Sequence, residues 1–447
     1  MRVFVLFLFS LTVSACADPA EDASVSETAE AAAYDGEWSG TLDTGGPQLR
    51  LLLEVAGDNA VLISLDQNQA RLPLDITRQD ASGFAGNVSS VGAAIDLERT
   101  GDDELSGTFA QGGATLPLTL VRGNLFAGNG EAADDFIVET AGGQLAGTLR
   151  LPAGDGPHPA ILMLNGSGSQ DRDANVAGQP VFAVLAEALA GRGIATLRLD
   201  DRGIGGSTAP APASPLELAE DASAALEALR SAQGVDARCV GALGHSEGAM
   251  IAFLGADGDN PAFILSLAGQ HGPMAEILYE QSEAIILASG GGQAAADRNR
   301  ALQDAMFSVM RDPAVEDHAA ALTAALVELG FPEAAAQQQG AMWGQDYAIA
   351  ALDLDPGPAM TAYDGPVRAL FGGRDLQVLA EPNRDRLLAA REGLPTEVAI
   401  LEGVNHLFQS AETGLPQEYA NAPHAMAPEA LEAIGMAAEG LFAQSCR

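Results

Sequence analysis

Apolar and polar residues alternate one by one along several short stretches between Tyr34 and Gly123. A strand points successive side chains to opposite faces, so a period of two predicts strands with one buried face. Turn residues separate these stretches, and no long helical pattern intervenes. We therefore expect a small antiparallel sheet, sandwich or barrel. The buried sets are 49, 51, 53 and 55, then Val61, Ile63 and Leu65, then 95 and 97, then 116, 118 and 120.

From Asp135 onward, short and fully apolar segments alternate with helical ones. Strands that are apolar on both faces are typical of a parallel sheet covered by helices on both sides. The expected fold class is therefore α/β, with a doubly wound, mostly parallel sheet. The expected strands are 160–164, 195–199, 240–243, 263–267, 367–371 and 398–401, and the expected helices are 180–191, 216–229 and one from Pro428.

Between Gly272 and Pro356 the strand pattern disappears. Apolar residues recur there at helical spacing, in 274–287, 298–310 and 319–329. The natural place for a helical insertion between two strands of such a sheet is above the sheet. We expect residues 272–356 to form a helical cap.

The N-terminal residues have the pattern of an export signal. Arg2 precedes an apolar run from Val3 to Leu11, which is too short to span a bilayer. Val13 to Cys16 resembles a bacterial lipobox, in which the cysteine is lipidated, although an ordinary cleaved signal with an incidental cysteine is an alternative. Ala17, rather than aspartate, follows the cysteine and by the same resemblance argues against retention in the inner membrane. We expect a periplasmic lipoprotein anchored in the outer membrane.

These patterns predict the domain organisation of the 447 residues. A signal peptide covers 1–15, and a lipid-anchored acidic linker covers 16–33. An antiparallel all-β domain follows at 34–127. Residues 128–447 form the α/β domain, with the cap at about 272–356.

The composition excludes some partners. The chain has 61 acidic and 22 basic residues, a formal net charge of −39. Such a surface repels nucleic acid and anionic membranes, so we expect no nucleic-acid partner and membrane contact only through the lipid anchor. Besides Cys16 there are Cys239, at the start of a buried strand, and Cys446, the last residue but one. An extracytoplasmic setting permits a disulfide between them, but we expect two unpaired thiols. Without CxxC or Cys/His metal spacing, neither a metal nor a cofactor is expected.

One pentapeptide carries candidate chemistry. Gly244 to Gly248 reads Gly-His-Ser-Glu-Gly and lies between the expected strand 240–243 and a helix. This context is typical of a nucleophile elbow, in which glycines permit a strained turn and the serine projects from the carboxyl edge of the sheet. Ser246 is the predicted nucleophile of a serine hydrolase. His245 is expected to pack as a neighbour.

A serine hydroxyl needs a base, and the base needs an acid that orients it. In a fold with this elbow, the acid and then the histidine follow the serine along the chain. His406 follows the last expected strand and is the predicted base, whereas His424 is expected to be a surface or capping residue. Asp375 follows the strand before that one and is the predicted acid. Its rivals, Asp353 and Asp355, have no strand behind them.

The oxyanion formed in acyl transfer needs two backbone N–H donors. One is predicted to be that of Glu247, directly after the nucleophile, and the other that of Ser167, in the Gly-rich turn 165–169. This turn lacks the Walker lysine and the GxGxxG spacing, so no nucleotide site is expected. In the cap, Met342, Trp343 and Tyr347 are candidate walls of the substrate pocket, although an ordinary cap core explains them about as well.

Several motifs together are similar to the EstD-type two-domain bacterial esterases of the α/β-hydrolase superfamily. The motifs are Asn165–Gly168, Gln170–Asp173, Asp201–Gly205, Gly244–Gly248, Gly373–Val378 and Asn405–Gln409. The resemblance implies an α/β-hydrolase fold behind a β-rich domain, hydrolysis of carboxylic esters, and a triad of Ser246, Asp375 and His406. Asn165 departs from the histidine that many relatives carry there.

The sequence thus predicts a serine carboxylesterase that cleaves small-molecule esters through an acyl-enzyme on Ser246. Two alternatives stay open. A serine hydrolase of this fold can instead be a peptidase, an amidase or a thioesterase. The β-domain could also be the functional part, as a module that binds envelope glycans or lipids, with hydrolysis secondary.

Overall fold

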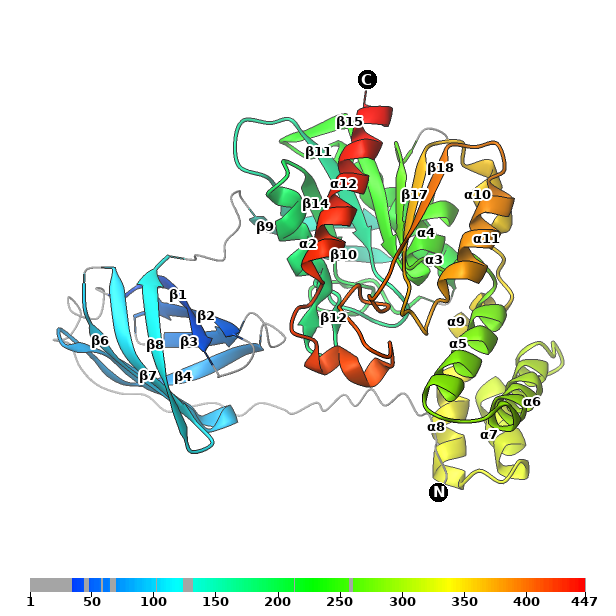
Figure 1. Cartoon of the computed structure of the whole chain (residues 1–447), viewed down its shortest axis with the longest axis horizontal. Helices are drawn as coiled ribbons and strands as arrows, with labels where there is room; N and C mark the ends of the chain where they lie inside the picture. The colour runs from blue at the N-terminus through cyan, green and yellow to red at the C-terminus, as the bar shows by residue number, and fades with distance from the viewer. Residues whose placement is uncertain are drawn as a thin grey trace.

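The computed structural model describes residues 34–446 apart from 44–47, 58, 65–69, 102, 124–131, 213 and 257–259. The predictions for residues 1–33, including lipidation of Cys16, lie outside this described part. Within it, no helix combines the length and the apolarity that a membrane span requires. An antiparallel barrel comes first, and an α/β sheet follows it (Figure 1).

The first domain is a closed barrel of antiparallel strands. Consecutive strands pair with each other, and β1 returns to β8 through Ser39 and Val121. Closure leaves no edge strand open to pairing with another chain. The strands are β1 (Gly36–Asp43), β2 (Gln48–Ala56), β3 (Asn59–Ser64), β4 (Ala70–Asp80), β5 (Gly83–Val88), β6 (Ala93–Arg99), β7 (Glu104–Gln111) and β8 (Ala114–Arg122), with the short 3-10 helix η1 (Ser89–Val91) before β6.

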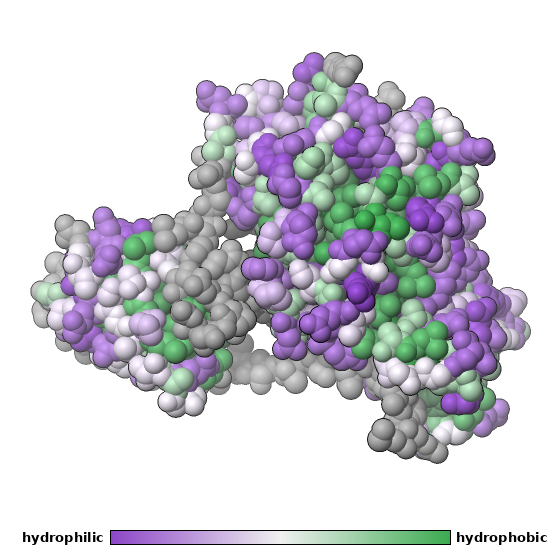
Figure 2. All heavy atoms as spheres, viewed as in Figure 1, coloured by the Kyte–Doolittle hydropathy of each residue, from purple (hydrophilic) through white to green (hydrophobic). Residues whose placement is uncertain are grey.

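Apolar side chains fill the barrel interior. Trp38 is fully buried, and its indole N–H donates to the backbone oxygen of Tyr34 at 2.7 Å, so its one polar group is satisfied. Phe84 and Leu53 are fully buried in the same cluster. On the face seen in Figure 2, hydrophilic and hydrophobic residues are interspersed over the barrel surface. This domain therefore has an ordinary hydrophobic core.

The buried face of β3 differs from the prediction. Leu62 pairs with Leu53 of β2 and shares its place in the interior cluster. Ile63 is buried as predicted, at 4% exposure, but it lies with the half-buried Val61 on the opposite side of the strand. Leu65 lies outside the described residues. Because residues 60–63 are all apolar, the strand by itself does not select a face, and the pairing register with β2 decides it.

The second sheet confirms the predicted α/β class. Its strand order is β18-β17-β16-β15-β11-β14-β10-β9. Strand β10 pairs antiparallel with both of its neighbours, β9 and β14, and all the other pairs are parallel. The carboxyl ends of the parallel strands meet at one edge, where ligands bind in such folds. The strands are β9 (Ala132–Thr140), β10 (Gly143–Arg150), β11 (His158–Leu164), β14 (Ala195–Leu199), β15 (Val235–His245), β16 (Ile264–Leu267), β17 (Val367–Gly372) and β18 (Thr396–Leu401), with a small separate hairpin, β12 (Asn175–Val176) and β13 (Gln179–Pro180).

Helices cover both faces of this sheet, each over its own apolar cluster. On one face lie α2 (Val181–Ala190) and α12 (Pro428–Ser445). On the other lie α3 (Pro215–Arg230), α4 (Glu247–Leu254), α10 (Gly357–Ala362) and α11 (Ala380–Ala390). Both α3 and α12 begin with a proline, whose fixed φ suits the first turn and whose missing N–H costs nothing there. The short 3-10 helix η2 (Pro416–Asn421) precedes α12.

Helices alone make up the insertion between β16 and β17. They are α5 (Met274–Ala288), α6 (Gln293–Met310), α7 (His318–Glu328), α8 (Glu333–Trp343) and α9 (Asp346–Leu352). These helices gather at one corner of the α/β domain (Figure 1). They bury a small core of their own that includes Phe307, Leu322 and Leu326. The sequence pattern missed α8 and α9, since both are short and α8 is rich in alanine and glutamine, which give little apolar periodicity.

Cys239 and Cys446 form a disulfide, with their Cα atoms 5.3 Å apart. The expectation of two unpaired thiols is therefore wrong. Helix α12 packs along the sheet, and its end brings Cys446 beside Cys239 in β15, the strand that leads to Ser246. The two cysteines are 207 residues apart. Only the packing of the last helix on the sheet reveals that they meet.

Candidate active site

Ser246 lies at the turn between β15 and α4, at the carboxyl edge of the sheet. Its backbone has φ 57° and ψ −121°. A non-glycine residue with positive φ is strained by about 1 to 3 kcal/mol and persists only where its surroundings hold it. A Cβ on Gly248 would collide with the backbone oxygen of Leu164, and one on Gly244 with the backbone of Gly248. The two glycines of the motif are thus required by close backbone approach, as expected of a nucleophile elbow.

Asp375 follows β17 and is 4% exposed. One of its carboxyl oxygens accepts the backbone N–H groups of Gln377 at 2.8 Å and Val378 at 2.9 Å. The other accepts a hydrogen bond from Nδ1 of His406 at 2.8 Å. Because all three donors converge on one carboxylate, the proton of His406 is held on Nδ1. Its Nε2 is then left as the acceptor.

His406 sits in a short loop after β18 that is held by a buried asparagine. The Asn405 side-chain oxygen accepts the N–H groups of Leu407 and Gln409, both at 3.0 Å. Its amide N–H donates to the Gln409 side chain at 3.0 Å. Asn405 and Gln409 are both fully buried. In the sequence these two residues stand out only as part of a motif, and the structure shows that they support the loop.

The residue before the nucleophile also contacts this loop. His245 donates from Nε2 to the backbone oxygen of His406 at 2.8 Å. The two imidazole rings are 4.7 Å apart between centroids. Burial, and then the charge that His406 can carry, lower the pKa of His245 to about 3. His245 is therefore neutral and serves as a packed neighbour, and it ties the His406 loop to the turn of Ser246.

The turn after β11 passes directly beside the nucleophile. A Cβ on Gly166 would lie 3.1 Å from the Cβ of Ser246, so the backbone at Gly166 is in close contact with the serine. Ser167 is the next residue along this turn. On the other side of Ser246, Glu247 begins α4, and the first N–H groups of a helix have no intrahelical acceptor. The structure thus brings both predicted oxyanion donors next to Ser246.

The Glu247 side chain joins this turn to the cap. It is 2% exposed. The Tyr347 hydroxyl, from α9, donates to its carboxylate at 3.0 Å, and the Ser167 hydroxyl donates to it as well. Burial raises the pKa of Glu247, and these two hydrogen bonds oppose the rise. No pattern in the sequence indicates this contact.

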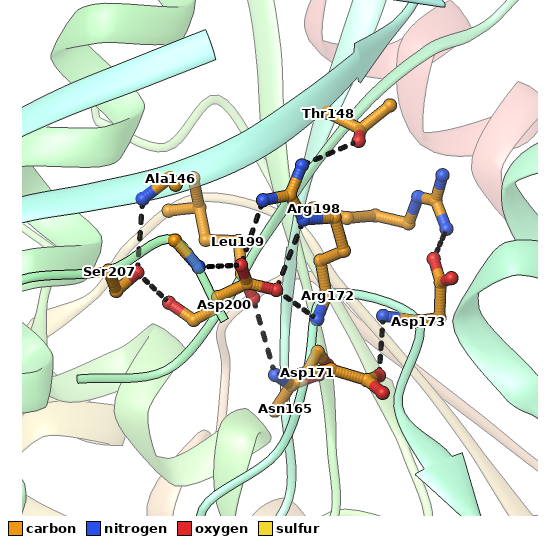
Figure 3. A network of polar contacts seen from close by, with 11 residues as sticks. Ala146, Thr148, Asn165, Asp171, Arg172, Asp173, Arg198, Leu199, Asp200 and Ser207 are labelled. Carbon is orange, nitrogen blue, oxygen red and sulfur yellow. Dashed lines mark hydrogen bonds and ion pairs between the residues drawn. The ribbon is translucent and has the colours of Figure 1, made fainter. Parts of the chain in front are cut away.

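Asp200 anchors the segment after the turn to the end of β14 (Figure 3). Its carboxylate accepts the Arg172 guanidinium at 2.8 and 3.1 Å and the Arg172 backbone N–H at 2.9 Å. Burial opposes ionisation, but the hydrogen bonds from Arg172 and Gly206 outweigh it and lower the pKa of Asp200. Beside this group, Asp173 pairs with Arg198 (Figure 3). Asp200 is a charged and well-compensated support.

Asp201, the next residue, holds the turn itself. It accepts the backbone N–H of Gln170 at 2.7 Å and the side-chain amide of Asn165 at 3.1 Å. Burial raises its pKa to about 7, with the charges of Asp200 and Glu247 adding to the rise. Arg202 cannot compensate it, since Arg202 is bonded to Asp221 and Glu217. The salt bridges around residues 200–202 are therefore formed by Asp200 and Arg202.

The candidate pocket residues divide into two groups. Tyr347 reaches Glu247, as described above. Trp343 packs against the core of the cap, and Met342 is 40% exposed. The rivals of the predicted base and acid lie elsewhere. His424 is exposed, and Asp353, at the end of the cap, pairs with Arg311. Over the described ranges, no group of three His, Cys, Asp or Glu side chains is arranged to hold a metal ion.

Comparisons with known proteins agree with this fold. The model of the alpha/beta hydrolase family matches residues 161–422. Esterase EstD of Thermotoga maritima is 26% identical over 284 residues, which are 63% of this chain and 62% of EstD. An uncharacterized protein of Mycobacterium tuberculosis strain H37Rv is 35% identical over 147 residues, 33% of this chain and 48% of that protein. The matched regions thus span less than two thirds of both relatives.

Two solved structures are similar to part of this chain. The alpha/beta hydrolase GrgF from Penicillium sp. sh18 covers 71% of this chain over all of its own length, at 18% identity and a TM-score of 0.45. Est1E from Butyrivibrio proteoclasticus covers 70% of this chain, also over all of its own length, at 14% identity and a TM-score of 0.41.

Proposed function

Because this chain belongs to the alpha/beta hydrolase family, we propose that it is a serine carboxylesterase that works through an acyl-enzyme on Ser246. The observation that carries this proposal is the arrangement of Asp375, His406 and Ser246 at one edge of the sheet, with the His406 Nδ1 bonded to Asp375 at 2.8 Å. The likeness to an esterase, EstD, supports ester hydrolysis rather than another reaction of the family. Fold alone would not select the reaction.

In the first half of the reaction, Nε2 of His406 takes the hydroxyl proton of Ser246 while Oγ bonds to the ester carbonyl carbon. Asp375 keeps the imidazole in the required tautomer and stabilises the imidazolium that forms. The alcohol then leaves with the proton from His406. In the second half, water attacks the acyl-enzyme by the same route and releases the carboxylic acid.

The negative charge of the tetrahedral intermediate falls on the former carbonyl oxygen. The N–H groups of Ser167 and Glu247 are proposed to bind it, and losing one such donor costs about 10² to 10³ in kcat. The contact between Gly166 and Ser246 supports this assignment, since it keeps the turn beside the reacting atom. We place the substrate pocket under the cap, with Tyr347 as one wall.

Amides and thioesters are the alternative substrates. A comparison of p-nitrophenyl esters of increasing chain length with matched p-nitroanilides and thioesters tests the proposal. We expect kcat/KM for esters to exceed that for anilides. Faster cleavage of the anilides would contradict the esterase assignment and identify an amidase or peptidase.

We also propose that the protein is a periplasmic lipoprotein, anchored in the outer membrane through Cys16. The disulfide between Cys239 and Cys446 supports an oxidising compartment, because disulfides are rare in the cytosol. Expression in a bacterium fed radiolabelled palmitate tests this. Label is expected on the wild type in the outer-membrane fraction and not on Cys16→Ser; label retained in that variant would contradict the proposal.

A further inference from the structure

Three segments that are far apart in the sequence meet at the carboxyl group of Glu247. The first is the turn after β11, through the Ser167 hydroxyl. The second is the nucleophile elbow, to which Glu247 itself belongs. The third is the cap, through the Tyr347 hydroxyl at 3.0 Å. A single carboxyl group therefore connects a predicted oxyanion donor, the nucleophile and the cap.

The environment of Glu247 makes these two hydrogen bonds important. The side chain is 2% exposed, so water does not replace a lost donor. The arginines of this edge are engaged with other carboxylates, Arg172 with Asp200 and Arg202 with Asp221. Burial accordingly raises the pKa of Glu247, and the hydroxyl groups of Ser167 and Tyr347 are the groups that oppose the rise. Removal of one of them leaves a buried acceptor short of a partner.

The position of Tyr347 depends on the same bond. Residues 344–347, together with Ala211 and Pro212, line a hollow of about 380 Å³ between the cap and the loop after β14. Tyr347 is therefore not packed tightly on that side. Because the hollow leaves it room to move, its hydrogen bond to Glu247 contributes to holding the start of α9 at the elbow.

We propose that Glu247 is a positioning residue that couples the docking of α9 to the oxyanion turn. When Tyr347 donates to the Glu247 carboxyl group, that group is held where it receives the Ser167 hydroxyl, and the Ser167 N–H is aimed at the substrate oxygen. When α9 moves away, the turn loses this support. The inference rests on the proposed function and adds a role for the cap in the chemical step as well as in binding.

Tyr347→Phe removes the hydroxyl and keeps the ring. We expect kcat for p-nitrophenyl acetate to fall about tenfold, since a small misplacement of a positioning group costs that much or more. KM should change less than about twofold, because the hydrogen bond between Tyr347 and Glu247 supports a donor to the transition state and not a contact with the bound substrate. Affinity for a trifluoromethyl ketone, whose adduct carries an oxyanion, should fall in parallel with kcat.

Tyr279→Phe is the matched control. The Tyr279 hydroxyl also bonds a carboxylate, Asp304 at 2.6 Å, but within the cap and away from Glu247. We expect wild-type kcat from this variant. At Glu247, glutamine keeps an oxygen that accepts a hydrogen bond and should restore most of the activity that Glu247→Ala loses. If glutamine and alanine lose equal activity, acceptance of these hydrogen bonds is not the role of Glu247.

Hydrogen exchange separates this inference from the proposed function, since it needs no substrate. The amides of residues 166–169 should exchange faster in Tyr347→Phe than in the wild type, and Tyr279→Phe should leave them unchanged. Unchanged exchange together with an unchanged kcat in Tyr347→Phe would overturn the coupling while the esterase proposal stands. A wild type that cleaves no ester would overturn the esterase proposal, whatever the exchange shows.

Discussion

The two sides of Ser246 are held in place by different means. We define the base side as Asp375, Asn405, His406 and Gln409, and the oxyanion side as residues 165–173 with Asp200, Asp201 and Glu247. On the base side, backbone N–H groups hold the Asp375 carboxylate, and a buried asparagine amide holds the loop of His406. On the oxyanion side, buried carboxyl groups do this work, and one of them needs a donor from the cap.

This difference shows which side of Ser246 responds to pH and to the position of the cap. The backbone N–H groups and the side-chain amide that support the base side do not titrate. Burial raises the pKa of the Asp201 carboxyl group to about 7, so this group changes its charge near neutral pH. The oxyanion side is therefore the side at which pH and cap position can act.

The largest expected effect is that of Asp375→Asn, on the base side. The amide oxygen can still accept the N–H groups of Gln377 and Val378, but the NH₂ group then faces Nδ1 of His406. That moves the histidine proton to Nε2, so the imidazole cannot accept the serine proton. We expect kcat to fall about 10⁴-fold, with stability little changed.

Asp353→Asn is the control for this variant, since Asp353 pairs with Arg311 remote from the site. Its kcat should stay within about twofold of wild type. If the two variants lose similar activity, Asp375 has no special role and the base side has been wrongly identified.

The disulfide joins β15 through Cys239, near the middle of the strand and away from Ser246, and it belongs to neither side. Its removal should therefore lower stability without changing the chemistry. We expect Cys446→Ser to lower the free energy of unfolding by about 3 kcal/mol, measured in urea, with kcat unchanged at 25 °C. A large loss of kcat in the folded variant would show that the region of β15 around Cys239 does affect the active site.

Asp201→Asn tests the pH response of the oxyanion side. The folded pKa of about 7 lies above the value of 3.8 expected for an unfolded aspartate. The folded state thus binds the extra proton, and the stability that this contributes is lost as pH rises through about 7. Between pH 5 and pH 8, the free energy of unfolding should fall by about 2 to 3 kcal/mol more in the wild type than in Asp201→Asn.

Chemical unfolding of both proteins at the two pH values measures this difference. Equal pH slopes for the wild type and Asp201→Asn would contradict the assignment of a titrating support to the oxyanion side.

Local sequence was sufficient to predict the positions of Ser246, Asp375 and His406. Each follows a strand whose apolar pattern is plain, and the carboxyl ends of parallel strands meet at one edge. The cap and the all-β domain could also be expected, because a change of period marks each boundary. The face of β3 could not, since residues 60–63 are apolar on both sides and only the pairing with β2 selects one.

Contacts between segments that are far apart in the chain could not be predicted from the sequence. Glu247 and Tyr347 are 100 residues apart, and they meet only because the cap packs over the elbow. Cys239 and Cys446 meet only because α12 lies along the sheet. The neighbours Asp200 and Asp201 look alike in the sequence, yet their pKa values shift in opposite directions, because Arg172 reaches one and not the other.

The central claim is that Ser246 is the nucleophile. It is tested most directly by incubating the wild type and Ser246→Ala with a fluorophosphonate, mapping the adduct by mass spectrometry, and measuring turnover of p-nitrophenyl acetate in parallel. We predict one adduct, on Ser246, with complete loss of turnover in the labelled protein and a loss of about 10⁶-fold in kcat for Ser246→Ala. Ester turnover that is unchanged in Ser246→Ala, or an adduct on another residue that abolishes activity, would contradict it.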